Sequence, residues 1–201
     1  MASAEMGLRR GEPGEFNFNQ SQPMKITLSR CVVRSFVPAD VDSVTKHVAS
    51  PQVARYMSAL PHPYYRHHAE EWIALATSGE PETHFGIEVD GEIVGGIGIQ
   101  HEAAQKLAVC AHDAEIGYWL GESYWGRGLA TEALSALTDW AFTSLGLRRL
   151  HAAVYAPNTA STRVLEKAGY TFEGRLRARY FRAGQFIDGL LYAKVQLPPA
   201  L

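Results

Sequence analysis

The chain alternates between short apolar runs and amphipathic stretches, a pattern that predicts strands and helices around one sheet. Unbroken or alternating apolar residues favour strands, whereas apolar spacings of three and four favour helices. Strands are predicted at residues 26–37, 84–89, 92–100, 115–120, 148–155, 171–177 and 186–196. Helices are predicted at residues 39–48, 51–56, 66–77, 128–145 and 157–167. This order of elements predicts an α/β (α+β) fold.

The organisation of the chain predicts one domain. Asp90-Gly91 joins two apolar runs and is the strongest two-residue hairpin signal in the sequence. Residues 101–113 are polar and lead into the next strand. Residues 1–24 hold scattered glycine, proline and charge with little periodicity, so we expect a flexible N-terminal tail before a domain at 25–201.

The stretch 114–134 combines a strand, a turn with two glycines and a helix. The strand at 115–120 is aromatic and β-branched, and Gly126 and Gly128 precede the apolar face of the helix. The first N–H groups of a helix lack internal partners and carry partial positive charge. Glycine lets a phosphate approach the backbone closely. The stretch therefore predicts a site for a phosphorylated cofactor.

Composition narrows the class of protein. With 201 residues, 46% of them hydrophobic, and a net charge of −2, the chain can bury one core and has no overall attraction to nucleic acid or anionic membrane. Neither a membrane span nor a signal peptide is visible, so we expect a cytoplasmic protein. Cys31 and Cys110 resemble small apolar residues, and the histidines lack metal-ligand spacing, so no metal site is predicted.

Two motifs carry a resemblance to a known family. The dinucleotide fingerprint G-x-G-x-x-G fails because position 131 is threonine. Residues 125–130, WGRGLA, instead resemble the R/Q-x-x-G-x-G/A pyrophosphate loop of the GNAT superfamily of N-acetyltransferases, with Trp125 where the family has Arg or Gln. Residues 156–174, APNTASTRVLEKAGYTFEG, are similar to the family's N-x-x-S-x-x-x-L-x-x-x-G-[FY] segment. Within the family, the stretch WGRGLATEAL at residues 125–134 is most similar to the branch that contains the ribosomal-protein alanine N-acetyltransferases.

The resemblance implies a single-domain GNAT-like fold, with a central mixed, mostly antiparallel sheet flanked by helices. It implies acetyl-CoA as co-substrate and no metal, and it leaves a homodimer open. In related enzymes the central strand separates from the next one, and the pantetheine arm pairs with its exposed backbone. The cofactor-binding residues implied for this chain are Gly117, Tyr118, Trp119, Leu120, Trp125, Gly126, Arg127, Gly128, Leu129, Ala130, Thr131 and Asn158.

Acetyl transfer to an amine needs a neutral amine and a proton for the departing thiolate. At pH 7, deprotonating an amine with a pKa of ~10.4 costs about 4–5 kcal/mol, whereas an α-amine near ~7.8 costs about 1 kcal/mol. Glu115 is the candidate base, acting through a water; otherwise it is a solvated or ion-paired carboxylate at a strand end. The resemblance favours the catalytic role, because a carboxylate at this place is common in related enzymes.

Ser161 is the candidate proton donor, although a serine in a first helical turn also bonds its own backbone. Asn158 is either a pantetheine ligand or a helix N-cap. Tyr155 and Tyr170 are further donor candidates, or members of the core. Because Cys110 lies away from both motifs, we expect direct transfer in a ternary complex and no acyl-enzyme.

The amine acceptor is predicted from the branch and from charge. The branch suggests a protein or peptide N-terminal α-amine, but it also contains enzymes for small amines, including polyamines and antibiotics, so a small-molecule acceptor stays an alternative. The segments expected near the acceptor, 56–72 and 175–188, hold more arginine than acidic residues, which disfavours a polycation. A CoA-binding module without turnover is a further alternative.

Overall fold

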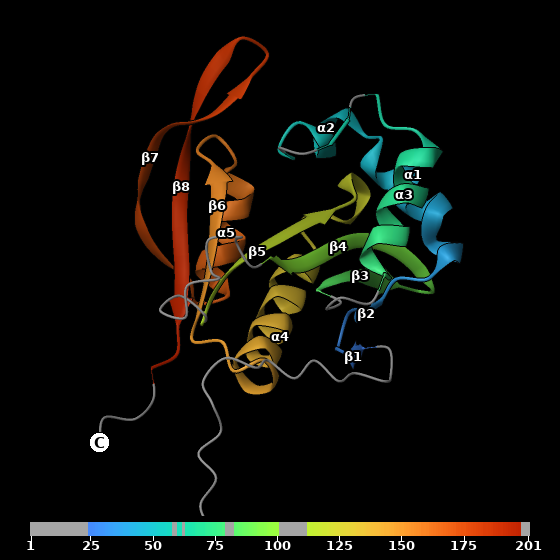
Figure 1. The fold of residues 1–201 in the computed structure, drawn as a ribbon, viewed down its shortest axis with the longest axis horizontal. Helices are drawn as coiled ribbons and strands as arrows, with labels where there is room; N and C mark the ends of the chain where they lie inside the picture. Colours follow the sequence, from blue (N-terminus) through green and yellow to red (C-terminus); the bar gives the residue numbers. More distant parts are fainter. Residues whose placement is uncertain (1–23, 58–59, 62, 79–82, 101–111, 198–201) are drawn as a thin grey trace, which may run out of the picture.

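A computed structural model describes residues 24–57, 60–61, 63–78, 83–100 and 112–197 (Figure 1). The strands are β1 (Lys25–Thr27), β2 (Val32–Ser35), β3 (His84–Val89), β4 (Glu92–Gln100), β5 (Asp113–Leu120), β6 (Arg149–Tyr155), β7 (Thr171–Arg182) and β8 (Gln185–Val195). The helices are α1 (Val41–Val48), α2 (Pro51–Ala54), α3 (Arg66–Ala76), α4 (Leu129–Ser144) and α5 (Thr159–Lys167), with 3-10 turns η1 (Pro38–Asp40) and η4 (Glu122–Tyr124). None of these helices is long and apolar enough to cross a membrane.

The strands form one sheet in the order β1-β2-β3-β4-β5-β6-β8-β7. Neighbouring strands are antiparallel except β5 and β6, which run parallel. The predicted mixed, mostly antiparallel sheet is therefore confirmed. Parallel neighbours need a crossover connection, and α4 supplies it between β5 and β6.

Helices cover both faces of the sheet. On one face, α4 contributes Leu134 and Leu137 to the main hydrophobic core. On the other face, α1 and α3 build a second core with Ile93 of β4, and Trp119 of β5 packs against it. Figure 1 shows α1 and α3 side by side, away from α4. Side chains of β5 therefore meet different helices according to the face on which they lie.

The predicted turn residues adopt the conformations that the prediction requires. Asp90 and Gly91 have φ of 51° and 82° and close the β3–β4 hairpin. Gly146 and Gly169, with φ of 66° and 84°, follow α4 and α5 where the sequence predicts that these helices end.

Two strand boundaries differ from the prediction. The strand predicted over 26–37 is two strands, because the chain reverses at a turn in which the Leu28 N–H donates to the Cys31 carbonyl over 2.9 Å. The last hairpin is longer than predicted, since β7 continues to Arg182. Register shifts and Ala178 at φ 52° let β7 bend while remaining paired with β8.

Most of the predicted tail and of the polar connection lies outside the described residues, which exclude 1–23 and 101–111. Cys110 lies in the second of these segments. Cys31 is described and is 5% exposed, so its predicted burial is confirmed. Burial, together with the charge of Glu132, raises the pKa of the Cys31 thiol to about 11.

Candidate active site

The site is built around the separation of β5 from β6. Their parallel ladder joins Asp113–Glu115 to Arg149–His151. Beyond Glu115, however, β5 continues to Leu120, and β6 continues to Tyr155. The two strands diverge over this length (Figure 1). The diverging edge of β5 includes Gly117–Leu120, the residues implied to pair with pantetheine, and an extended ligand could add to it as a strand does.

The turn between η4 and α4 has the backbone geometry of an anion site. Gly126 and Gly128 have φ of 75° and 80°, a region in which side chains are strained. A Cβ atom added to Gly126 would meet no other atom within 4 Å, so the turn presents open backbone. Gly128 is the N-cap of α4, a helix of 16 residues. The N–H groups at the start of α4 therefore suit a pyrophosphate.

The first residues of α4 divide between packing and binding. Leu129 is 3% exposed and anchors the helix start in the main core. Ala130 and Thr131 are half-buried and complete the first turn. The backbone of these three residues, more than their side chains, is what the turn offers to a phosphate.

The two large side chains of the motif hold the turn itself. The Trp125 indole Nε1 donates to the Leu120 carbonyl over 2.7 Å, at the end of β5. The Arg127 guanidinium donates to the Ser123 carbonyl over 2.8 Å and lies over the Tyr124 ring, 5.0 Å from its centroid. Trp125 therefore stands in a structural role at the position where the family has Arg or Gln.

The side chains of Tyr118 on β5 and Ser161 on α5 are in contact. The Tyr118 hydroxyl lies 2.8 Å from Ser161 Oγ and donates to the Ser161 carbonyl over 3.1 Å. Burial raises the pKa of Tyr118 to about 12, so its hydroxyl stays protonated at neutral pH. Tyr118 packs against the main core, whereas Trp119 points to the opposite face. The sequence did not predict this hydroxyl pair, because 43 residues separate its members.

Asn158 caps α5. Its side-chain Oδ1 accepts from the Ser161 N–H over 3.2 Å, so the structural reading of this asparagine is confirmed. The cap uses the oxygen of the side-chain amide, and a contact to pantetheine would use its nitrogen. The same cap fixes Ser161 in the first turn, where its hydroxyl reaches Tyr118.

Glu115 lies on the face of β5 opposite to Tyr118. Side chains alternate along a strand, so Glu115 shares a face with Gly117 and Trp119. Glu115 is half-buried at the last position at which β5 pairs with β6. Burial is the larger cause of the raised pKa of Tyr180, and the negative charge of Glu115 raises it further.

Three tyrosines from β6, β7 and the segment after α2 form an aromatic cluster, called the aromatic wall below. Tyr155 of β6 and Tyr180 of β7 are stacked, with ring centroids 4.1 Å apart, and the Tyr180 hydroxyl donates to the Ala153 carbonyl over 2.8 Å. The ring of Tyr56, after α2, lies 6.3 Å from that of Tyr155. Arg182 of β7 donates to the Met57 carbonyl over 2.8 Å, tying the last hairpin to this segment. No periodicity in the sequence pointed to Tyr180.

The two tyrosines named as further proton donors occupy structural positions. Tyr170 is 3% exposed, and its hydroxyl lies 2.7 Å from Thr138 Oγ1 in the core. Burial, the largest cause, raises the pKa of Tyr170 well above its ordinary value. Tyr155 is 6% exposed and stacked on Tyr180.

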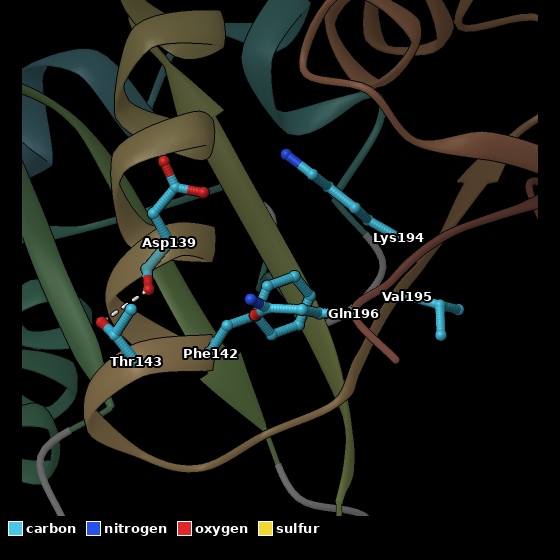
Figure 2. A pocket seen from close by; sticks show the side chains of 6 residues that line it. All are labelled: Asp139, Phe142, Thr143, Lys194, Val195 and Gln196. Atoms are coloured by element: carbon cyan, nitrogen blue, oxygen red, sulfur yellow. Dashed lines mark hydrogen bonds between the residues drawn. The ribbon is translucent and has the colours of Figure 1, made fainter. Parts of the chain in front are cut away.

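A separate shallow pocket lies at the other end of α4. Figure 2 shows Asp139, Phe142 and Thr143 of α4 facing the end of β8, where Lys194 to Gln196 complete the lining. These α4 residues belong to the last turns of the helix, whereas the glycine turn precedes its first. The pocket is therefore distinct from the anion site.

Comparison with known proteins agrees with this geometry. The family model for the acetyltransferase (GNAT) domain matches residues 30–171. The uncharacterized N-acetyltransferase p20 of Bacillus licheniformis is 31% identical over 172 residues, covering 82% of this chain and 92% of that protein. RimJ of Mycobacterium smegmatis, solved in complex with a CoA disulfide, superposes with a TM-score of 0.67 at 29% identity, covering 82% of this chain and 81% of that one.

Two relatives whose names state an acceptor match shorter stretches. The ribosomal-protein-serine acetyltransferase of Escherichia coli is 38% identical over 82 residues, 41% of this chain and 46% of that protein. The spermidine N(1)-acetyltransferase of the same species is 30% identical over 111 residues, 55% and 57% of the two chains. Each match covers less than two thirds of the relative's own length. The names of the two relatives state different acceptors, a ribosomal protein and spermidine.

Proposed function

This chain belongs to the GNAT family of acetyl-CoA-dependent N-acetyltransferases, and on that premise we propose that it acetylates a protein or peptide N-terminal α-amine by direct attack in a ternary complex. The observation that carries the proposal is the arrangement of β5. Its diverging edge and the glycine turn lie next to one another along the chain. Two candidate proton-transfer groups, Glu115 and the Ser161–Tyr118 pair, lie toward opposite faces of the same strand.

The residues fit acetyl-CoA in three places. The backbone of Gly126 to Thr131 would hold the pyrophosphate, and the edge of β5 would pair with the pantetheine amides. Asn158 would add a contact from its side-chain nitrogen. Acetyl-CoA supplies the activated thioester. Bound in this way, acetyl-CoA would direct its acyl end toward the point where β5 and β6 separate.

Proton transfer is divided between the two faces of β5. Glu115 would remove a proton from the acceptor amine, directly or through a water, as the amine attacks the thioester carbonyl. As the carbon–sulfur bond breaks, Ser161 Oγ would relay a proton to the leaving thiolate and take one from solvent in its place, while Glu115 would release the proton of the amine to solvent. Tyr118 lies within hydrogen-bond distance of that oxygen and would hold the hydroxyl in position.

The charges near the aromatic wall support an α-amine acceptor over a polyamine. Arg182 reaches across to the Met57 carbonyl, and Arg55 lies over the Tyr56 ring at 4.7 Å from its centroid. Asp188 pairs with Arg175 over 3.0 Å. A spermidine cation at this wall would be repelled by Arg55 and Arg182, and the Asp188 carboxylate is already paired with Arg175. An N-terminal peptide brings one cationic group, which must lose its charge to react.

The test compares two acceptors at equal concentration, with release of free CoA thiol as the readout. A short peptide beginning with Ala or Ser should turn over at least tenfold faster than spermidine. A tenfold preference for spermidine would refute the α-amine assignment. Binding of acetyl-CoA without turnover of a broad amine panel would favour a CoA-binding module without catalysis.

A further inference from the structure

The turn between β1 and β2 is fastened to the start of α4. The Ser29 N–H and the Ser29 hydroxyl both donate to Glu132 Oε1, over 2.8 and 2.6 Å. Glu132 lies in the first turn of α4, 103 residues further along the chain. Charge-assisted bonds of this kind are short and directional. The contact therefore places the residue after Ser29 beside the glycine turn.

That residue is Arg30, and its side chain lies on the glycine turn. Arg30 Nη1 donates to the Arg127 carbonyl over 3.4 Å, at the long limit of a hydrogen bond. A Cβ atom added to Gly128 would overlap the same nitrogen. Arg30 is exposed, so its guanidinium can change partners without disturbing the core. The contact with Gly128 brings a full positive charge to the backbone that suits an anion.

The other side chains of the turn are already engaged. Trp125 occupies the motif position of the family's Arg or Gln and bonds the end of β5. Arg127 is folded back on Ser123 and Tyr124. A pyrophosphate bound to this turn would carry negative charge that neither contact neutralises directly. Arg30 is the described arginine whose side chain reaches Gly128 from outside the motif.

We propose that Arg30 binds the pyrophosphate of acetyl-CoA, supplying from the β1–β2 turn the cationic contact that Trp125 does not provide. The inference rests on the assignment of acetyl-CoA to this turn. The guanidinium exchanges its long bond to the Arg127 carbonyl for a phosphate oxygen, a stronger and charge-assisted partner. The bonds between Ser29 and Glu132 hold the β1–β2 turn, and with it Arg30, beside the start of α4. A turn 103 residues before Glu132 in the chain thereby completes the cofactor site.

The experiment measures ligand affinity by isothermal titration calorimetry. The variants are Arg30→Ala and Arg30→Gln, and the matched control is Lys25→Ala, which removes an exposed cation from β1 at the entry to the same turn. The ligands are CoA and dephospho-CoA, which keeps the pyrophosphate but lacks the 3′-phosphate. Both Arg30 variants should raise the Kd of both ligands roughly tenfold or more, whereas Lys25→Ala should stay within about twofold.

A second arm uses S-acetylpantetheine, an acyl donor without any phosphate. Its kcat/KM should be the same in the Arg30 variants and in the wild type, because the contact that they lose does not exist for this donor. Unchanged melting temperatures of the ligand-free variants would confirm that the fold is intact, and Arg30→Gln serves if Arg30→Ala fails to fold.

The outcomes separate the inference from the assignment on which it rests. If the wild type does not bind CoA, the cofactor assignment to this chain is wrong. If the wild type binds CoA and both Arg30 variants bind it equally well, the role of Arg30 is refuted. A loss confined to CoA and absent with dephospho-CoA would place the contact at the 3′-phosphate and overturn the pyrophosphate inference.

Discussion

Replacing Glu115 by Gln removes the candidate base while keeping the size and polarity of the side chain. A general base contributes about 10²–10⁴-fold to a rate. Because an α-amine near pKa ~7.8 costs only about 1 kcal/mol to deprotonate at pH 7, we expect the low end of that range. The kcat/KM of Glu115→Gln for an Ala- or Ser-starting peptide should fall about 100-fold at pH 7.

The pH dependence of this loss identifies its cause. At pH 9 nearly all of an α-amine with a pKa near ~7.8 is neutral, so the deficit of Glu115→Gln should shrink to about tenfold or less. An amine with a pKa of ~10.4 is still mostly protonated at pH 9, and its deficit should persist. The assay is a pH–rate profile of CoA release from pH 6.5 to 9.5 with both kinds of amine.

A structural readout separates loss of the base from loss of the fold. The charge of Glu115 helps to raise the pKa of Tyr180, so Glu115→Gln should lower that pKa. The matched control is Glu166→Gln on α5. The Glu166 carboxylate accepts from the Tyr192 hydroxyl over 3.1 Å, and this bond is the second cause, after burial, of the raised pKa of Tyr192. This control should lower the pKa of Tyr192 and leave turnover unchanged.

Tyrosine ring carbons labelled with ¹³C report both pKa values by NMR titration. The reasoning about the base is refuted if Glu115→Gln lowers the pKa of Tyr180 as expected and yet keeps kcat/KM within about threefold of the wild type at pH 7. A pH-independent deficit would also count against it, because a base that deprotonates an α-amine must lose importance as the amine becomes neutral.

Three other predictions concern Ser161 with Tyr118, Cys31 and Asp188. Ser161→Ala should lower kcat about 10²-fold and Tyr118→Phe about tenfold, and the reverse order in steady-state kinetics would make Tyr118 the proton donor. Cys31 should resist iodoacetamide at pH 8 until the chain unfolds, judged by peptide mass spectrometry, because burial keeps its thiol protonated. Asp188 has a lowered pKa, since it accepts from the Ala178 N–H. It should therefore stabilise the fold above its ordinary pKa, and the melting temperatures of wild type and Asp188→Asn should differ at pH 7 and converge as the pH falls below the ordinary pKa of an aspartate.

Local signals predicted the parts of the site that lie close together in sequence. The apolar run at 115–120 and the glycines that follow it predicted a strand, a turn and a helix start, and the structure has all three. Positive φ at Gly126 and Gly128 follows from steric limits that act within one or two residues. The N-cap by Asn158 is equally local, because donor and acceptor are three residues apart.

Contacts between distant segments could not be predicted in this way. The sequence gives no periodic signal that Ser29 bonds Glu132, or that Tyr118 meets Ser161. Both contacts depend on the packing of strands and helices that one sheet brings together. The single strand predicted over 26–37 shows the same limit, because the two polar residues Ser29 and Arg30 did not indicate a chain reversal.

The topology distinguishes β5 and β6, the parallel pair of the described sheet, as the place of the candidate site. Antiparallel neighbours exchange hydrogen bonds along their whole overlap, and a short connection suffices between them. The parallel pair β5 and β6 is joined through α4, so the chain must leave the carboxyl end of β5 and enter α4 at its N-terminus. That places the positive end of the helix dipole beside the carboxyl end of β5, where an anionic group of a ligand would be stabilised. Because pairing with β6 stops at Glu115, the rest of β5 has an edge at which an extended ligand could pair, and its side chains alternate between the face of Glu115 and the face of Tyr118.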